Sequence, residues 1–347
     1  MKKSIKKLIA MGIIAALAAA ATGCSGSTEE TTAAASSEAA EAEESTDQEA
    51  EETEAAEGES YKVGVIQYIQ HDALDRANEG FVEALTEAGF PAEIDQQNAS
   101  GDTASCTTIA QKFVSDGDDL IFAVATPAAQ AVAAETTDIP IVLTAVTDPA
   151  DSGLVADNAA PGGNVTGSSD LTPVKEQIQL LHNIFPDAKK VGVLYCSAES
   201  NSAIQAEMAH EACEELGLEA VDYTVATSND IQTMVESMVG EVDVLYAPTD
   251  NVIAAGMSTV AMIANENMLP TVVGEQGMVD AGGLVTYTID YKELGKVAGQ
   301  MAIRILQDGE DPAEMPIEYY PSDKLQLVVN EDTAAVLGID PSTITME

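Results

Sequence analysis

The sequence predicts an α/β protein built from two doubly wound parallel-sheet lobes. Two observations lead to this prediction. Segments typical of strands and of helices alternate through most of the chain, which is the pattern of a parallel sheet covered by helices on both faces. The chain also repeats itself, because VGVIQYIQHD at 63–72 is followed 128 residues later by VGVLYCSAES at 191–200. Two halves with the same order of parts predict two similar lobes.

Further echoes keep the same order in both halves. Gly89-Phe90 closes the first helical segment and Gly217-Leu218 closes its repeat, again 128 residues apart. The other pairs are DLIFAVATP (119–127) with DVLYAPTD (243–250), IPIVLT (139–144) with LPTVVG (269–274), and SGLV (152–155) with GGLV (282–285). The repeated order indicates an internal duplication.

The N-terminal region has the features of an export signal. Residues 1–23 combine a basic start with the apolar run LIAMGIIAALAAAA at 8–21, the pattern of a secretory signal peptide. This run is shorter than the about 20 residues that a transmembrane helix needs. Small residues precede Cys24, as in the bacterial lipobox, although Ala21 stands where Leu is commoner. We expect Cys24 to become an acylated first residue; the alternative is an ordinary signal peptide with an incidental cysteine.

Residues 24–60 are predicted to form an acidic, disordered linker. From Ser25 to Ser60 the chain has no Lys, Arg, aromatic residue, Val, Leu or Ile. Such a segment cannot bury enough apolar surface to offset the entropy of ordering, and its like charges keep it extended. The formal net charge of −45 also argues against nucleic acid as a partner, because its phosphates would be repelled.

The first lobe is predicted to alternate strands and helices from its start. Leu74 and Phe81 lie on one apolar stripe of the first helix, and Thr103 or Asp102 is a candidate cap for the second. Strands are predicted at 62–69, 91–98, 119–126 and 139–146, and helices at 71–90, 101–117 and 126–137. A loop carrying PGGNVTG at 161–167 is expected to follow.

The second series begins after a helix at 172–186, which has Pro173 in its first turn. Strands are predicted at 191–195, 219–225, 243–249, 271–275 and 284–290, with helices at 200–217, 229–239 and 251–268. A long helix at 291–309 and a strand at 324–330 complete the chain.

The predicted elements imply three crossings between the lobes, near 168–174, 286–292 and 312–322. The first lobe is therefore expected to contain 61–170 plus 290–312, and the second 171–289 plus 320–347. Ligands of open α/β sheets bind beyond the carboxyl ends of the strands. We expect both sets of strand ends to face one cleft, whose closure would surround a small molecule.

Several motifs together resemble a known family. They are IAQKFV (109–114), ATPAAQA (125–131), TAVTDP (144–149), PGGNVTGSSDLTPVKEQ (161–177), PTDN (248–251) and IDYKELG (289–295). From about Val63 to Val329 the chain resembles the ABC-transporter substrate-binding lipoproteins of the tryptophan/tyrosine-uptake type. One departure is EQGM at 275–278, where family members often carry an Asp-Thr-Asp-Ser-like stretch. This departure concerns the side-chain end of the ligand.

The resemblance implies a type I periplasmic-binding-protein fold with a three-crossing hinge. It implies capture of a free, typically aromatic amino acid and delivery to an ABC permease and its ATPase. The protein would be a monomer without cofactor or metal, anchored to the outer face of the bacterial cell membrane by lipid on Cys24. The alternatives are a receptor of the same fold that serves a signalling partner, or an importer component for a branched amino acid, a nucleoside or a small peptide.

The sequence carries no pattern that favours an enzyme. H-E-x-x-H, G-x-S-x-G, the Walker lysine loop and a G-x-G-x-x-G after the first strand are all missing. The cysteines after the linker, Cys106, Cys196 and Cys213, have no C-x-x-C spacing, so they predict neither a disulfide framework nor a zinc site. We expect Cys106 and Cys213 to be small residues within helices, and a Cys196–Cys213 bridge is disfavoured.

The carboxylate of an amino acid needs hydrogen-bond donors, which helix starts supply through backbone N–H groups and the helix dipole. Thr126 offers a hydroxyl at one such start. The corresponding candidates of the second lobe are Ser200, Asn201 and Ser202. For all four residues the alternative is plain capping of their own helix.

The ammonium group of an amino acid needs an acceptor. Asp250 is the first candidate because it follows a buried strand, and its alternative role is to cap the helix at 251. Asp148 and Glu275 lie at matching turns of the two halves and are further candidates. A carboxylate that stays ionised in a cleft needs a partner, which a bound cation supplies.

Aromatic side chains could pack against an aromatic ligand. Tyr68 and Tyr246 are the candidates, and for Tyr246 the alternative is a core position with its hydroxyl reaching water. His71 lies in the first strand–helix turn and is a further candidate for ligand contact.

Overall fold

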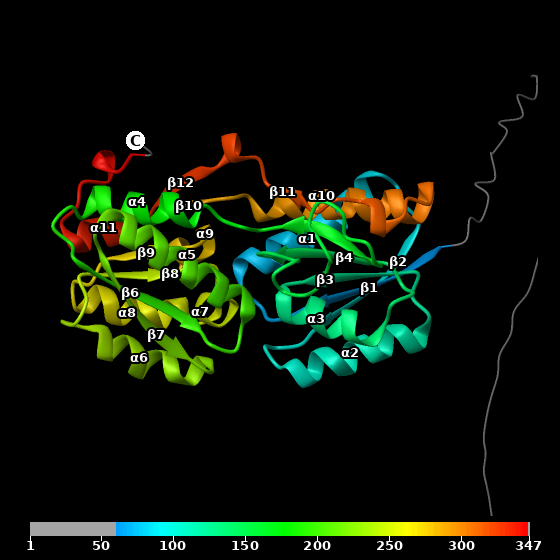
Figure 1. Cartoon of the computed structure of the whole chain (residues 1–347), viewed down its shortest axis with the longest axis horizontal. Coiled ribbons are helices and arrows are strands. Elements are labelled where there is room, and N and C mark those ends of the chain that lie inside the picture. Colours follow the sequence, from blue (N-terminus) through cyan, green and yellow to red (C-terminus); the bar gives the residue numbers. More distant parts are fainter. Residues whose placement is uncertain (1–59, 346–347) are drawn as a thin grey trace, which may run out of the picture. The chain divides into compact units, whose positions relative to one another are not determined.

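The computed structural model describes residues 60–345. The predicted signal peptide, Cys24 and all of the linker but Ser60 lie outside the described residues. The described chain contains two six-stranded sheets, mostly parallel, with helices on both faces (Figure 1). This architecture confirms the predicted fold class. Within residues 60–345, no helix combines the length and the apolar character that a membrane crossing requires.

Lobe 1 is built on the sheet with strand order β11-β5-β4-β3-β1-β2. Its strands are β1 (Tyr61–Gln67), β2 (Ala92–Asn98), β3 (Leu120–Val124), β4 (Ile141–Val146), β5 (Val165–Ser169) and β11 (Glu318–Tyr319). Its helices are α1 (Asp72–Glu87), α2 (Thr103–Asp116), α3 (Thr126–Glu135) and α10 (Tyr291–Ile303). All strand pairs of this sheet are parallel.

Lobe 2 repeats this order as β12-β10-β9-β8-β6-β7. Its strands are β6 (Lys190–Cys196), β7 (Glu219–Val225), β8 (Val244–Ala247), β9 (Thr271–Val273), β10 (Val285–Thr288) and β12 (Gln326–Val329). Its helices are α4 (Val174–Ile184), α5 (Ser200–Leu216), α6 (Ile231–Met238), α7 (Asn251–Ala255), α8 (Met257–Glu266), α9 (Gln276–Asp280) and α11 (Glu331–Leu337). Only β12 runs antiparallel to its neighbour in this sheet.

The repeated sequence is matched by a repeated backbone geometry at the ends of α1 and α5. Gly89 and Gly217 follow α1 and α5 with φ of +62° and +73°, a left-handed conformation that favours glycine. The next residue closes each turn in the same way, because Phe90 N donates to Leu85 O and Leu218 N donates to Cys213 O, both at 2.9 Å. The same device therefore ends the first helix of each lobe.

The chain crosses between the lobes after β5, after β10 and between β11 and β12. The second crossing delivers α10 back to lobe 1, where it packs closely along α1. Glycines permit this approach: a Cβ on Gly80 would lie 2.0 Å from Lys292 O, and one on Gly295 would lie 1.9 Å from Ala77 O. The third crossing comes late, because β11 at 318–319 still pairs with β5 of lobe 1.

Three local expectations were wrong. The predicted loop at 161–167 becomes strand β5 from Val165, because Gly167 lets it approach β4: a Cβ there would lie 2.1 Å from Leu143 O. The predicted helix at 251–268 is interrupted at Gly256, which packs against Ile231. The helices α9 and α11 were not predicted at all.

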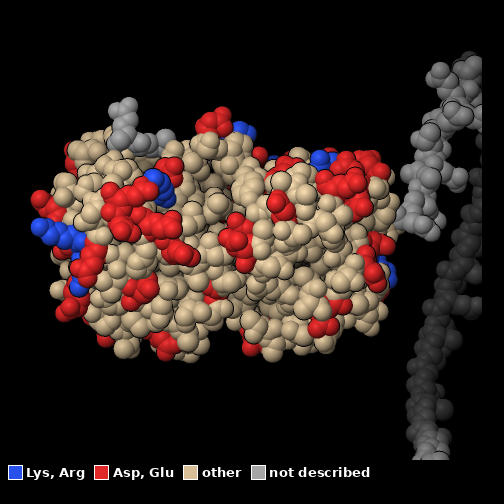
Figure 2. All heavy atoms as spheres, viewed as in Figure 1, with Lys and Arg blue, Asp and Glu red and all other residues tan. Residues whose placement is uncertain are grey.

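Cys106, Cys196 and Cys213 are free thiols buried in the two lobes, so no disulfide joins them. The surface is strongly acidic, and Figure 2 shows Asp and Glu side chains spread over the visible face with few Lys or Arg.

Candidate ligand-binding site

The ends of strands from both lobes meet around a small cavity, here called the interlobe cavity. Lobe 1 contributes His71, Leu74, Ala145, Asp170 and, from the start of α10, Tyr291; lobe 2 contributes Asn201, Thr249, Asp250, Asn251, Ala254 and Glu275. Its volume is about 10 Å³, about the room that one water molecule occupies. The lobes therefore lie closely together at this point.

A hydrogen-bond chain crosses the cavity from His71 to Glu199. His71 Nε2 lies 3.2 Å from Asn251 Oδ1, and Asn251 Nδ2 donates to Glu199 Oε2. Because the amide nitrogen of Asn251 faces the carboxylate, its oxygen faces His71, and Nε2 must carry the proton. The other nitrogen, Nδ1, is then a bare acceptor, and it is buried without a hydrogen-bond partner among residues 60–345. Burial lowers the pKa of His71 to about 4, so the ring is neutral at pH 7.

Glu199 is the lobe 2 counterpart of His71, since each precedes the helix that follows the first strand of its lobe and the two lie 128 residues apart. Its carboxylate is buried and accepts hydrogen bonds from N–H groups of Asn201, Asn251 and Val252. Burial raises the pKa of Glu199, and the neighbouring Asp250 raises it further. Two carboxyl groups close together in a buried site disfavour ionisation of both.

Asp250 is placed as the cap of α7. Its Oδ1 accepts from Ile253 N at 2.7 Å, and its Oδ2 accepts from Cys196 N at 2.6 Å and from Ser202 Oγ at 2.7 Å. Burial raises the pKa of Asp250 despite these bonds. The carboxylate borders the interlobe cavity, but both of its oxygens already accept hydrogen bonds within lobe 2.

Two further carboxyl groups border the cavity. Glu275 caps α9, where Met278 N donates to Oε1 at 2.9 Å and Gly277 N to Oε2 at 2.5 Å. Asp170 accepts from the Tyr291 hydroxyl at 2.8 Å. Burial raises the pKa of Glu275 to about 7 and that of Asp170 to about 6. The cavity is therefore surrounded by potential negative charge.

Lobe 1 presents an uncapped helix start beside the strand end that carries Ala145 of the cavity wall, because Ala125 N donates to Thr144 O at 3.0 Å. Ala125 precedes α3 with φ +82° and ψ 152°, and its side chain offers no cap. Ala145, after β4, has φ +54°. A non-glycine residue at such angles is strained, and strain of this kind gathers at functional sites. Thr126 is 1% exposed and its Oγ1 has no hydrogen-bond partner in the described chain, so a hydroxyl and the N–H groups of α3 converge on a candidate anion site.

The other predicted residues lie at varying distances from the cavity. Tyr68 is buried and donates its hydroxyl to Gly101 O at 3.0 Å. Asp148 bonds its own turn, through the N–H groups of Ala150 and Asp151. Ser200 is exposed, 3.4 Å from Gln130 Nε2 of lobe 1.

Tyr246 lies in the core of lobe 2. Its side chain is fully buried and donates a hydrogen bond of 2.7 Å to Gln177 Oε1. This is the alternative that was considered for Tyr246, with Gln177 in place of water, and the residue is not part of the interlobe cavity.

Sequence reasoning missed five polar residues here: Asp170, Glu199, Thr249, Asn251 and Tyr291. One signal was available for Glu199, because the 128-residue offset places it opposite His71, itself a candidate. Asp170 and Tyr291 lie in two of the three predicted crossings, where no local pattern distinguishes a cavity residue from a hinge residue.

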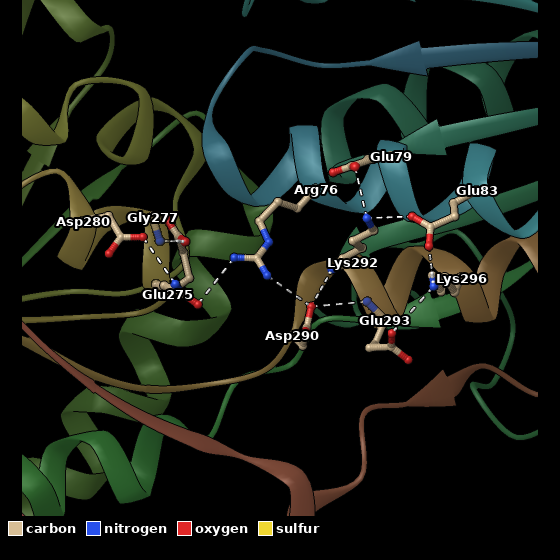
Figure 3. Close-up of polar contacts among 11 residues, drawn as sticks. Arg76, Glu79, Glu83, Glu275, Gly277, Asp280, Asp290, Lys292, Glu293 and Lys296 are labelled. Atoms are coloured by element: carbon tan, nitrogen blue, oxygen red, sulfur yellow. Dashed lines mark hydrogen bonds and ion pairs between the residues drawn. The ribbon is translucent and has the colours of Figure 1, made fainter.

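Contacts across the rim hold the two lobes together (Figure 3). Arg76 of α1 lies 3.6 Å from Asp290, which caps α10 in the same lobe, and it donates across to Gln276 of α9 in lobe 2 at 3.5 Å. Gly277 packs against Asp72, since a Cβ on it would lie 2.6 Å from the Asp72 Cβ. A larger residue than glycine at 277 would keep the lobes apart at this point.

Comparison with known proteins identifies the family. Residues 62–344 match the family model described as ABC transporter substrate binding protein. The chain belongs to this family. The substrate-binding protein is 41% identical over 281 residues to the tyrosine-binding protein of Clostridioides difficile strain R20291, covering 80% of this chain and 81% of the relative.

Solved structures agree with this assignment. The ABC domain from Streptococcus pneumonia in complex with L-Trp is 36% identical, with 82% of this chain and 97% of that chain covered and a TM-score of 0.79. The ligand-free, open structure of a substrate-binding protein with adhesive properties from Clostridium difficile is 42% identical, with 81% and 95% covered and a TM-score of 0.63.

Family membership confirms the prediction of a binding protein in place of an enzyme. It places this substrate-binding protein outside the cytoplasm, with a small-molecule ligand and a permease as partners. In the described part of the chain, no group of three or more His, Cys, Asp or Glu is arranged to hold a metal ion.

Proposed function

We propose that the protein captures an aromatic amino acid, tyrosine or tryptophan, between its two lobes and delivers it to an ABC permease. The observation that carries the proposal is a difference between the helix starts of the two lobes: one has no side-chain cap, and the other is surrounded by carboxyl groups. On lobe 1 the uncapped start of α3, with the unpartnered Thr126 Oγ1, suits a carboxylate. Across from it, lobe 2 presents the buried carboxyl groups of Glu199, Asp250 and Glu275, which suit an ammonium group.

The relatives support the aromatic part of the proposal. One relative at 41% identity is a tyrosine-binding protein, and one solved structure at 36% identity contains L-Trp. The chain superposes better on that complex than on the open, ligand-free relative, although the open relative shares more identical residues. This difference favours a closed arrangement of the lobes here.

The size of the cavity adds a mechanical step. Ligand pockets usually measure about 300–1,000 Å³, whereas the interlobe cavity measures about 10 Å³. An aromatic amino acid therefore enters only when the lobes move apart, which breaks rim contacts such as Arg76 with Gln276. The lobes then close around the ligand as far as its size allows, so the permease meets a ligand-bound, closed complex.

The proposal includes a lipid anchor on Cys24, with residues 25–60 as its tether. The support is the sequence alone, namely the basic start, the apolar run and the small residues before Cys24. The expected result is that the chain fractionates with membranes and that Cys24→Ala releases it into the medium. Release of the unchanged chain would contradict the anchor.

The test of the ligand is a calorimetric titration of the purified protein, stripped of cargo by unfolding and refolding, with each of the twenty amino acids. We expect L-tyrosine or L-tryptophan to bind with a Kd of about 1 μM or tighter, near −8 kcal/mol. No heat with any aromatic amino acid, together with binding of a branched one, would contradict the ligand and leave the family unaffected.

A further inference from the structure

Side-chain donors on the wall of the interlobe cavity already have partners within residues 60–345. The Tyr291 hydroxyl donates to Asp170, and the Thr249 hydroxyl donates to Gln205 Oε1 at 2.7 Å. The His71 Nε2–H donates to Asn251. The amide groups of Asn201 and Asn251 donate to Glu199. Apart from the second N–H of the Asn251 amide, the unused hydrogen-bonding capacity of these side chains is in acceptors.

Two acceptors on this wall have no hydrogen-bond partner within residues 60–345. They are His71 Nδ1 from lobe 1 and Asn201 Oδ1 from lobe 2, and both atoms are buried. Asn201 is 4% exposed. A buried acceptor without a partner costs about 1–3 kcal/mol, so two of them around one cavity indicate a group that donates to both.

Size and charge narrow the choice of that group. A space of about 10 Å³ accommodates a water-sized group and excludes a ring or a carboxylate. The carboxyl groups of Asp170, Asp250 and Glu275 border the same space, so a cation is favoured over a neutral donor. An ammonium group has three donors, no acceptor and the required size.

We propose that the interlobe cavity is the ammonium subsite of the amino-acid ligand, and that His71 Nδ1 and Asn201 Oδ1 are its two direct hydrogen-bond acceptors. This inference rests on the proposed function and assigns the ammonium to residues other than Asp250. Asp250 and Glu199 then act through others: Asp250 holds α7 in place, and Glu199 fixes the amide of Asn251, which in turn fixes the His71 tautomer.

The assignment also fixes the direction of the ligand. With its ammonium between His71 and Asn201, its carboxylate can turn toward the start of α3 and Thr126. The protein should therefore reject molecules that have the aromatic ring and carboxylate but no ammonium, because both acceptors would be left buried and unpaired.

The test compares L-tyrosine with 3-(4-hydroxyphenyl)propionate, which lacks only the ammonium group. Calorimetric titrations use the unmodified protein and two variants, His71→Phe and Asn201→Leu, each of which removes one acceptor. His182→Phe is the matched control, because its Nδ1 is also buried without a partner but lies on α4, outside the cavity. Thermal unfolding of each variant checks its fold.

We expect the unmodified protein to prefer L-tyrosine at least 100-fold, a result that includes no detectable binding of the propionate. His71→Phe and Asn201→Leu should each weaken L-tyrosine binding at least tenfold without weakening any propionate binding, and His182→Phe should change neither. Equal affinity for both ligands in the unmodified protein, or variants that bind L-tyrosine as tightly as the control does, would overturn the subsite.

Failure of every aromatic amino acid to bind would contradict the proposed function and not, by itself, the ammonium subsite. If no aromatic amino acid binds, the same comparison is made between whichever of the twenty amino acids does bind and its deaminated counterpart. A preference for the ammonium-bearing molecule would support the subsite while the aromatic ligand is abandoned. Binding of no amino acid at all would overturn both.

Discussion

The two lobes share one chain path but use equivalent helix starts differently. In lobe 1, α3 follows β3 through Ala125, whose backbone is strained and whose side chain caps nothing. In lobe 2, α7 follows β8 through Asp250, whose carboxylate occupies the helix start. A helix start filled by the protein's own carboxylate cannot receive another anion. The duplicated lobes therefore differ at this position, with an uncapped helix start on lobe 1 and a helix start occupied by a carboxylate on lobe 2.

A second equivalent pair shows the same divergence. His71 and Glu199 hold matching positions before α1 and α5, and the chain joins them through Asn251. One is a neutral acceptor and the other a buried carboxyl group. The two positions are equivalent in the repeated chain path. Because they carry different side chains, the two sides of the cleft differ chemically, which two identical lobes would not.

The largest expected effect comes from removing the cap of lobe 2. Asp250→Ala should lower the free energy of unfolding by about 2–4 kcal/mol, because Ile253 N, Cys196 N and the Ser202 hydroxyl lose their acceptor. Denaturant unfolding measures the loss. Asp148→Ala is the control, since Asp148 accepts only within its own loop of lobe 1, from Ala150 N, Asp151 N and the Asn158 amide. A stable Asp250→Ala protein that has lost ligand binding would instead make Asp250 the ammonium acceptor.

Asp170 and Glu275, two buried carboxyl groups that border the interlobe cavity and are here called the acidic wall, should make the protein less stable as pH rises. Burial holds the pKa of Asp170 at about 6 and that of Glu275 at about 7, above their ordinary values. The folded state then binds more protons than the unfolded state, so this contribution is complete below about pH 4 and is lost as pH rises through about 6–7. Melting temperatures in matched salt should fall from about pH 5 to about pH 8.

Glu275→Gln sharpens this test because it keeps the shape and removes one titrating group. The free energy of unfolding should then decrease less between about pH 5 and pH 8 than in the unmodified protein, by an amount on the order of 1–2 kcal/mol. Glu83→Gln is the control, because the exposed Glu83 pairs with Lys292 and Lys296 (Figure 3) and its pKa is lowered to about 2. A melting temperature independent of pH in both proteins would contradict a buried acidic wall.

The open helix start of lobe 1 should matter for binding more than for stability. Thr126→Val removes the unpartnered Oγ1 and keeps the shape, so stability should change by less than about 1 kcal/mol. Affinity for L-tyrosine should fall about tenfold, or about 1.4 kcal/mol. Thr108→Val, at an exposed position of α2, is the control. Unchanged affinity of the Thr126 variant would remove this residue from the site.

The smallest expected effect is relief of strain before α3. Ala125→Gly should raise the free energy of unfolding by about 1 kcal/mol, because glycine accepts φ +82° and ψ 152° without steric cost. Ala88→Gly at the end of α1, where φ is −74°, should lower it. Loss of stability in both variants would show that Ala125 is not strained.

The sequence predicted the fold well because its signals are periodic and repeated. The alternation of strands and helices and the 128-residue offset are visible without any contact between distant residues. The loop at 161–167 was mispredicted for the opposite reason. Val165–Ser169 becomes a strand only because Gly167 can lie against Leu143 of β4, a contact that no local pattern records.

The site was predicted in part. Turns after strands pointed to Thr126, Asp250 and Glu275, because strand order alone places them near the cleft. The same reasoning could not tell an open helix start from a filled one. Whether Asp250 faces a ligand or its own helix depends on Cys196 N and Ser202 Oγ, which only the folded chain brings within reach.

A crystal structure of the protein grown with L-tyrosine tests the central claim most directly. We expect a ligand ammonium within hydrogen-bond distance of His71 Nδ1 and Asn201 Oδ1, and a ligand carboxylate at Thr126 Oγ1 and the first N–H groups of α3. A ligand bound in the opposite direction, with its carboxylate against lobe 2, would contradict it, and so would electron density for L-tyrosine anywhere but between the lobes.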